Sequence, residues 1–91
     1  MLTLSTGKAE WNRIYNHQQQ ELTREANDYW KTRFANAGML DEEGNPKQYA
    51  MADVKLVNGY GKKAPWMAIR VKLKIRDGQY VLPILKQERV R

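Results

Sequence analysis

The sequence predicts an α+β domain in which one long N-terminal amphipathic helix packs on a three-stranded antiparallel β-meander. Two observations support this prediction. Apolar residues recur at helical intervals from about Lys8 to Ala37 without Pro or Gly, and an alternating apolar and polar pattern with a two-residue turn occupies positions 67–85. We expect positions 1–91 to form a single domain, with the helix over 8–37 and a β half over 47–87.

The helix prediction rests on a stripe of apolar and aromatic residues that winds around the helix: Trp11, Ile14, Tyr15, Leu22, Ala26, Tyr29, Trp30, Phe34 and Ala37. Either the helix curves around one twisted sheet, or its two ends bury against different surfaces. A helix of this length measures about 45 Å, whereas a ten-residue strand measures about 33 Å, so the helix should overhang the sheet. We therefore expect Trp11, Ile14 and Tyr15 to be partly uncovered and to support a homodimer of paired helices.

Three short segments define the ends and the middle of the predicted helix. Residues 1–6 form either a short strand or a lead-in whose Ser5 or Thr6 caps the helix. The polar run 16–20 interrupts the apolar stripe, and we interpret it as an exposed waist of the same helix. Gly38 is expected to end the helix in a left-handed conformation.

The middle of the chain contains two loops. Residues 41–46 form an acidic run followed by Gly, Asn and Pro, which predicts a surface turn. Residues 49–57 favour a strand, although a short helix over 46–52 is the alternative. The second loop, over 58–65, combines glycines with Tyr60, Lys62 and Lys63 just before Trp66. Such a loop can approach phosphates and stack on a base, but a hairpin loop with solvated lysines is the more common origin of this pattern.

Asp77-Gly78 predicts a two-residue hairpin turn between two strands. This turn sets the register, in which the following residues face each other: Arg76 and Gln79, Ile75 and Tyr80, Leu73 and Leu82, Val71 and Ile84, and Ile69 and Lys86. One face of the hairpin is apolar and is expected to pack on the helix; it contains Ile69, Val71, Leu73, Ile75, Tyr80, Leu82 and Ile84. Pro83 cannot donate a ladder hydrogen bond, which predicts an edge strand or a bulge. Residues 86–91 are expected to form a basic tail.

The positive charge lies in the second half of the chain. Positions 1–46 carry five basic and seven acidic side chains, a balance of −2, whereas positions 47–91 carry eleven and three, a balance of +8. The opposite face of the hairpin places Arg70, Lys72, Lys74 and Arg76 in one row. This asymmetry favours an anionic partner for the β half, either nucleic acid or an acidic protein surface.

The sequence contains few groups for catalysis. Cysteine is absent, the one histidine, His17, lies among Asn and Gln, and the acidic run 41–43 lacks the spacing of a calcium loop. We therefore expect no enzyme activity, no metal and no cofactor. The first residues lack the features of a signal peptide and no apolar run could span a bilayer, so we expect a cytoplasmic protein without membrane contact.

These patterns predict a small non-catalytic nucleic-acid-binding module. Its phosphate contacts would come from the basic face and the second loop, through Lys62, Lys63, Arg70, Lys72, Lys74 and Arg76, and its stacking contacts from Tyr60 and Trp66. The alternative is a protein-binding module, such as a compact phage or mobile-element inhibitor or assembly factor that acts on an acidic or apolar partner surface.

Overall fold

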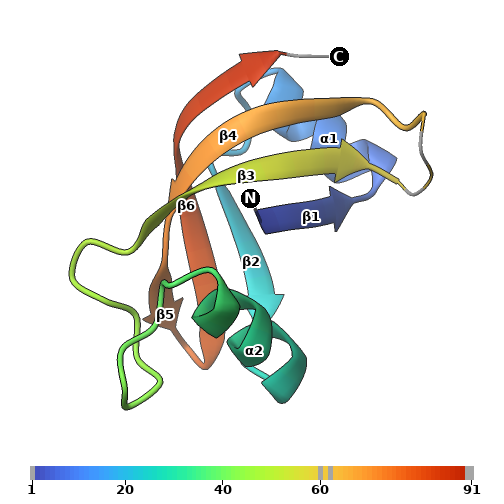
Figure 1. The fold of residues 1–91 in the computed structure, drawn as a ribbon. Coiled ribbons are helices and arrows are strands. Elements are labelled where there is room, and N and C mark those ends of the chain that lie inside the picture. Colours follow the sequence, from blue (N-terminus) through green and yellow to red (C-terminus); the bar gives the residue numbers. More distant parts are fainter. Residues whose placement is uncertain (1, 60, 62, 90–91) are drawn as a thin grey trace.

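The computed structural model describes residues 2–59, 61 and 63–89, and within this part of the chain six strands form one curled, mixed sheet (Figure 1). The strand order is β1-β3-β4-β6-β2, with β5 beside β6; β1 runs parallel to β3, and the other pairs are antiparallel. The strands are β1 (Leu2–Thr6), β2 (Glu21–Glu25), β3 (Met51–Asn58), β4 (Trp66–Lys72), β5 (Lys74–Arg76) and β6 (Gln79–Arg89). The predicted three-stranded meander is therefore wrong.

The predicted helix over 8–37 is also wrong, because this segment forms a helix, a strand and a second helix. The helices are α1 (Lys8–Tyr15) and α2 (Asp28–Asn36), with β2 between them. His17 turns the chain out of α1 with a φ of 60°. The polar run 16–20 contains no apolar side chain that a helix could bury, whereas β2 buries Leu22 and pairs with β6. Tertiary pairing here outweighs local helical periodicity.

Asn27 begins α2, since its Oδ1 accepts a hydrogen bond from the backbone N–H of Trp30 at 3.0 Å. Replacing Asn27 by Ala should lower the free energy of unfolding by about 0.5–2 kcal/mol, the usual cost of losing such a cap. In a continuous helix the same change would be stabilising, because Ala is the better helix former. Urea melts can measure the sign. Thr32→Ala, on the exposed surface of α2, is the control and should leave stability unchanged or slightly raised; a stabilising Asn27→Ala would contradict the cap.

Several local predictions are confirmed. Gly38 follows α2 with a φ of 75°, and the N–H of Met39 donates to the carbonyl of Phe34 at 3.1 Å, as in a Schellman ending. The turn over 41–46 is present, with the Asp41 carboxylate accepting from the N–H groups of Glu43 and Asn45. Residues 51–58 form a strand and not a short helix.

The Asp77-Gly78 turn is confirmed, with φ values of 54° and 73° that only a type I′ turn combines. Beyond it, three predicted pairings are observed: Arg76 with Gln79, Ile75 with Tyr80, and Val71 with Ile84. Three details are wrong. Ile75 is 46% exposed and not buried. Leu73 lies between β4 and β5 and does not pair with Leu82. Ile69 pairs with Gln87 instead of Lys86 because the register shifts between Arg70 and Val71.

Pro83 explains why the predicted strand over 67–76 is divided into β4 and β5. In an antiparallel hairpin every second residue directs its N–H and C=O groups toward the partner strand. Gln79 and Val81 direct theirs toward β5, and Pro83 would be the next residue to do so, but proline has no N–H. The β5–β6 ladder ends at Lys74 and Val81, and just beyond it the N–H of Leu73 donates to the carbonyl of Ala50 at 3.0 Å. Pro83 thus lies in a central strand beside a bulge. Residues 86–89 belong to β6 and not to a tail, and residues 90–91 lie outside the described residues.

The curl of the sheet brings β2 and α2 close to β1 (Figure 1). Arg24 of β2 donates to the carbonyl of Ser5 at 3.0 Å, and Arg33 of α2 donates to the carbonyl of Thr3 at 2.5 Å. The Arg24 and Arg33 side chains therefore hydrogen-bond to carbonyls that the edge strand β1 would otherwise expose. These contacts protect β1 from pairing with another chain. The core lies inside the curl and includes Leu4, Ile14, Leu22, Phe34, Met39, Val54, Leu56, Met67, Val71 and Leu82.

Candidate nucleic-acid interface

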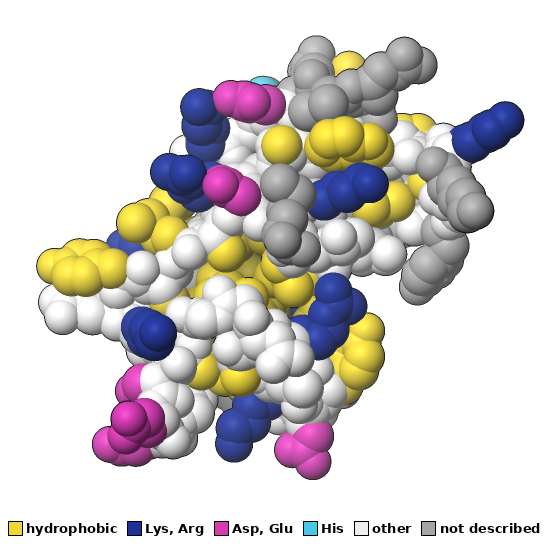
Figure 2. Space-filling view, in the orientation of Figure 1, with side chains coloured by type: hydrophobic (Ala, Val, Ile, Leu, Met, Phe, Trp, Pro, Cys, Tyr) yellow, Lys and Arg dark blue, Asp and Glu magenta, His cyan; other side chains and the backbone are white. Residues whose placement is uncertain are grey.

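One surface of the sheet is left uncovered by the described helices. We call it the outer face, and it consists of the sides of β3, β4 and the second half of β6 that point away from the core; α1 lies behind it and α2 below it in Figure 1. Alternation along the strands places these side chains on it: Met51, Asp53, Lys55, Val57, Trp66, Ala68, Arg70, Lys72, Leu85, Lys86 and Glu88. Figure 2 shows this face, where Lys and Arg side chains lie beside apolar ones.

Trp66 and Lys55 form a cation–π pair at one end of the outer face. The Lys55 Nζ lies 4.9 Å from the centroid of the Trp66 ring, and both side chains are half-buried. Because a cation rests over the ring, that side of the ring faces the surface and not the core. Sequence reasoning missed Lys55, and only the register that pairs Val57 with Trp66 could have placed it beside this ring.

The other end of the outer face carries Arg70, Lys72 and Lys86. Arg70 pairs with Asp53 through Nε and Oδ1 at 3.0 Å, and this hydrogen bond, together with the charge of Arg70, lowers the pKa of Asp53. Lys86 is the cross-strand neighbour of Arg70 and pairs with Glu88 at 3.0 Å. The side chains assigned to the outer face include four cations and two carboxylates, a balance of +2, to which the exposed Lys63 in the β3–β4 loop adds one more.

The structure divides the cations that the sequence placed in one row. Arg70 and Lys72 lie on the outer face with Trp66, whereas Lys74 and Arg76 lie on β5 beyond the break at Leu73. Arg76 forms an ion pair with Glu21 of β2 at 2.5 Å. The predicted contacts Tyr60 and Lys62 lie outside the described residues.

The residues expected to support a dimer belong to the core of this chain. Trp11 and Ile14 are buried, and Tyr15 is half-buried and packs against the core. Trp11 stacks on Tyr15 with ring centroids 6.5 Å apart. The expected overhang does not exist, because α1 is eight residues long. The structure therefore does not support the predicted homodimer through Trp11, Ile14 and Tyr15.

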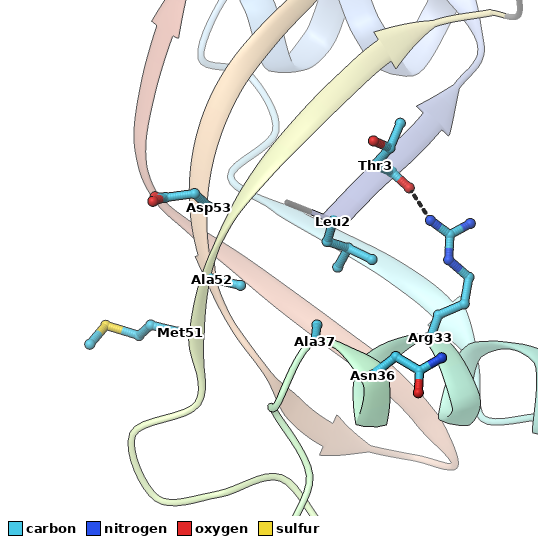
Figure 3. A pocket seen from close by; sticks show the side chains of 8 residues that line it. All are labelled: Leu2, Thr3, Arg33, Asn36, Ala37, Met51, Ala52 and Asp53. Carbon is cyan, nitrogen blue, oxygen red and sulfur yellow. Dashed lines mark hydrogen bonds between the residues drawn. The ribbon is translucent and has the colours of Figure 1, made fainter.

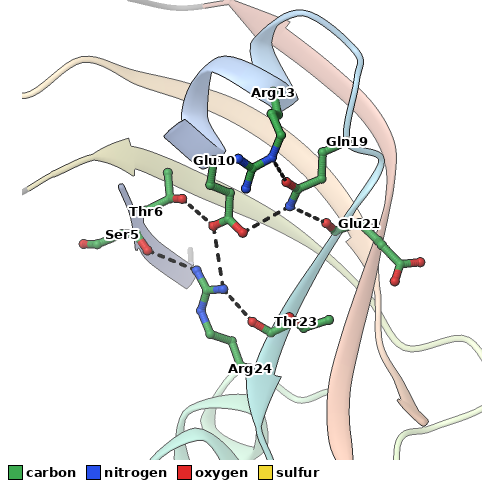
Figure 4. Close-up of polar contacts among 8 residues, drawn as sticks. All are labelled: Ser5, Thr6, Glu10, Arg13, Gln19, Glu21, Thr23 and Arg24. Carbon is green, nitrogen blue, oxygen red and sulfur yellow. Dashed lines mark hydrogen bonds and ion pairs between the residues drawn. The ribbon is translucent and has the colours of Figure 1, made fainter. Parts of the chain in front are cut away.

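A polar cluster around Glu10 joins α1 to β1 and β2 (Figure 4). The Glu10 carboxylate accepts hydrogen bonds from the Thr6 hydroxyl and from Gln19 Nε2, and Arg24 lies 4.0 Å away. Burial alone would raise the pKa of Glu10, but these hydrogen bonds and the charges of Arg24 and Arg13 outweigh it and lower the pKa. We regard this cluster as structural, since its members satisfy one another.

A pocket of about 780 Å³ lies between β1, β3 and α2 (Figure 3). Its charged groups already have partners. Arg33 donates to Thr3 and to the hydroxyl of Tyr29, and its guanidinium lies 5.3 Å from the centroid of the Trp30 ring. Asp53 points away from the pocket in Figure 3 and pairs with Arg70. The described lining of the pocket thus presents no set of convergent free polar groups.

Comparisons with protein-family models, with curated proteins and with solved structures find no match for this chain. Neither α1 nor α2, the helices of the described segments, combines the length and the apolar character needed to cross a membrane. Nowhere among residues 2–59, 61 and 63–89 do three or more His, Asp or Glu side chains gather as they would around a metal ion.

Proposed function

We propose that this protein is a small, non-catalytic nucleic-acid-binding module that uses the outer face. The observation that carries the proposal is the Lys55 and Trp66 pair on a sheet surface that the described helices leave open, with further cations on the adjoining strands. Cations neutralise phosphates and release counterions, and an accessible aromatic ring offers a platform for a base. The acidic partners Asp53 and Glu88 are exposed, so their ion pairs are weak and can give way to phosphate contacts.

The test replaces one cation at each end of the outer face. Lys55→Gln combined with Lys72→Gln should leave the fold intact, weaken binding to any sequence about equally, and lower the salt slope by about 1.4 for a single strand, at about 0.7 per lost contact. Fluorescence anisotropy with a labelled mixed-sequence oligonucleotide at 50 and 200 mM salt, concentrations chosen on the order of those over which such contacts weaken, measures both quantities.

The matched control removes the same charge elsewhere. Lys8→Gln combined with Lys74→Gln alters one exposed cation on α1 and one on β5, and it should change binding little. An equal loss of binding affinity in the control variant would show that the interface does not lie on the outer face. A wild-type protein without salt-sensitive binding tighter than about 100 µM would refute nucleic-acid binding altogether.

A specific observation favours a protein partner as the second candidate. Met51 and Leu85 are 48% and 49% exposed on the outer face, and Tyr49, two residues before Met51, is 75% exposed. Aliphatic side chains offer little to a base but bury well against a protein surface. A partner that is acidic and partly apolar would then depend on one or two of these anchors, whereas nucleic-acid binding should tolerate Met51→Ala and Leu85→Ala.

A further inference from the structure

Among the described residues, the neighbours of Trp66 on the outer face are mostly small. Its cross-strand neighbour Val57 and the next outward residue of its own strand, Ala68, have short side chains, and Lys55 is the group found over the ring. A base stacked on an aromatic ring contributes about 5- to 150-fold in affinity, whereas a cation–π contact contributes about 2- to 5-fold at an exposed site and about 30-fold when desolvated. A base that stacks on the Trp66 ring would displace the Lys55 ammonium, which then becomes available to a phosphate.

The remaining cations of the outer face lie toward the C-terminal end of β4, which begins at Trp66. Lys72 is six residues further along β4, which corresponds to about 20 Å. Arg70 lies between them, and Lys86 lies beside Arg70 on β6. At about 3.4 Å per stacked nucleotide, a chain of about six nucleotides would reach from the ring to the far cations.

Duplex nucleic acid fits this surface less well. The faces of its bases are stacked on one another and are not available to a ring on the surface of a sheet. The described part of the outer face also carries no helix that could enter a groove, because α1 lies behind the sheet (Figure 1). A duplex would meet the cations alone and leave Trp66 unused.

We infer that the outer face selects single-stranded over duplex nucleic acid, with one base stacked on Trp66 and the neighbouring phosphates on Lys55, Arg70, Lys72 and Lys86. This inference rests on the proposed function and adds the class of ligand to it. The contacts involve phosphates and the face of a base, which DNA and RNA share, so single strands of either should bind with similar affinity.

The experiment compares a labelled 12-nucleotide mixed-sequence single strand, as DNA and as RNA, with the DNA duplex of the same sequence. Wild-type protein should bind both single strands at least about 5-fold more tightly than the duplex. Trp66→Ala should remove this preference and leave duplex binding unchanged, while Trp66→Phe should keep most of it. Affinity for oligothymidine should rise with length up to about six nucleotides and then level off.

The outcomes separate the two proposals. Duplex binding equal to or tighter than single-strand binding, or an equal loss of both in Trp66→Ala, would overturn the inference while nucleic-acid binding stands. Binding to none of the three probes would refute the proposed function itself. Should Trp66→Ala fail to fold, the wild-type ratio of single strand to duplex, together with the Trp66→Phe variant, still decides the matter.

Discussion

Replacing Leu82 by Ala is expected to lower the free energy of unfolding by about 2–5 kcal/mol. Leu82 has no exposed surface and pairs with Leu22 of β2. It lies in β6, the strand that joins both parts of the curled sheet: the first half of β6 pairs with β2 and β5, and the second half pairs with β4. The cavity left by the truncation would lie at the centre of the core, where neighbouring strands cannot collapse without losing their ladders. Urea denaturation followed by circular dichroism measures the loss.

Ile75→Ala is the matched control for this change. Ile75 precedes the Asp77-Gly78 turn and is 46% exposed, so its truncation should cost less than about 1 kcal/mol. If both positions faced the core, as the alternating pattern alone predicts, the two losses would be similar. Equal losses would therefore contradict the exposure of Ile75 beyond the break at Leu73.

Glu10→Gln should lower the free energy of unfolding by about 1.5–3 kcal/mol at pH 7, because the carboxylate accepts hydrogen bonds from Thr6 and Gln19 and faces Arg24. The pKa of Glu10 is lower in the folded protein than its ordinary value of 4.5, so its contribution is complete above that value. It is lost as the pH falls through the folded pKa. The stability difference between wild type and variant should therefore shrink on acidification.

Urea melts of both proteins between pH 7 and about pH 3.5 measure this dependence. Glu42→Gln is the control, since Glu42 is exposed in the loop before β3, and it should change stability little at any pH in this range. A Glu10→Gln loss that stays constant down to the lowest pH would show that the charge of Glu10 does not stabilise the fold.

The parts of the fold that the sequence predicts correctly depend on backbone geometry within a few residues. Asp77-Gly78 adopts the expected turn because few residue pairs accept two positive φ angles, and Gly38 ends α2 for the same reason. Residues 51–58 form the favoured strand. Each of these predictions needed no knowledge of the rest of the chain.

The prediction of one long helix is wrong because some of its apolar residues fit the spacing of a strand as well as that of a helix. Leu22 fits the helical stripe, but it also fits a strand, and its pairing opposite Leu82 decides between them. The signals against one helix were the polar run 16–20 and the N-cap residue Asn27, which the apolar spacing on either side outweighed.

The candidate site was predictable only in part. The sequence points to Trp66, Arg70 and Lys72, which do share the outer face, although their role in binding stays a prediction. Lys55 and Lys86 come to this face from β3 and β6, through registers that no local pattern reveals. Lys74 and Arg76 belong to the same alternating run but lie beyond the break.

By itself, the sequence determined the turns, the hairpin at Asp77-Gly78 and the excess of positive charge in the second half of the chain, because these depend on single residues and on composition. Only the tertiary structure decided that residues 21–25 form a strand, that the predicted strand over 67–76 is divided at Leu73, and which cation lies over the Trp66 ring. The physical reason is that strand pairing joins residues far apart in the chain. β2 forms because β6 offers it a ladder and a core, and Pro83 separates the pairing of β6 with β5 from its pairing with β4.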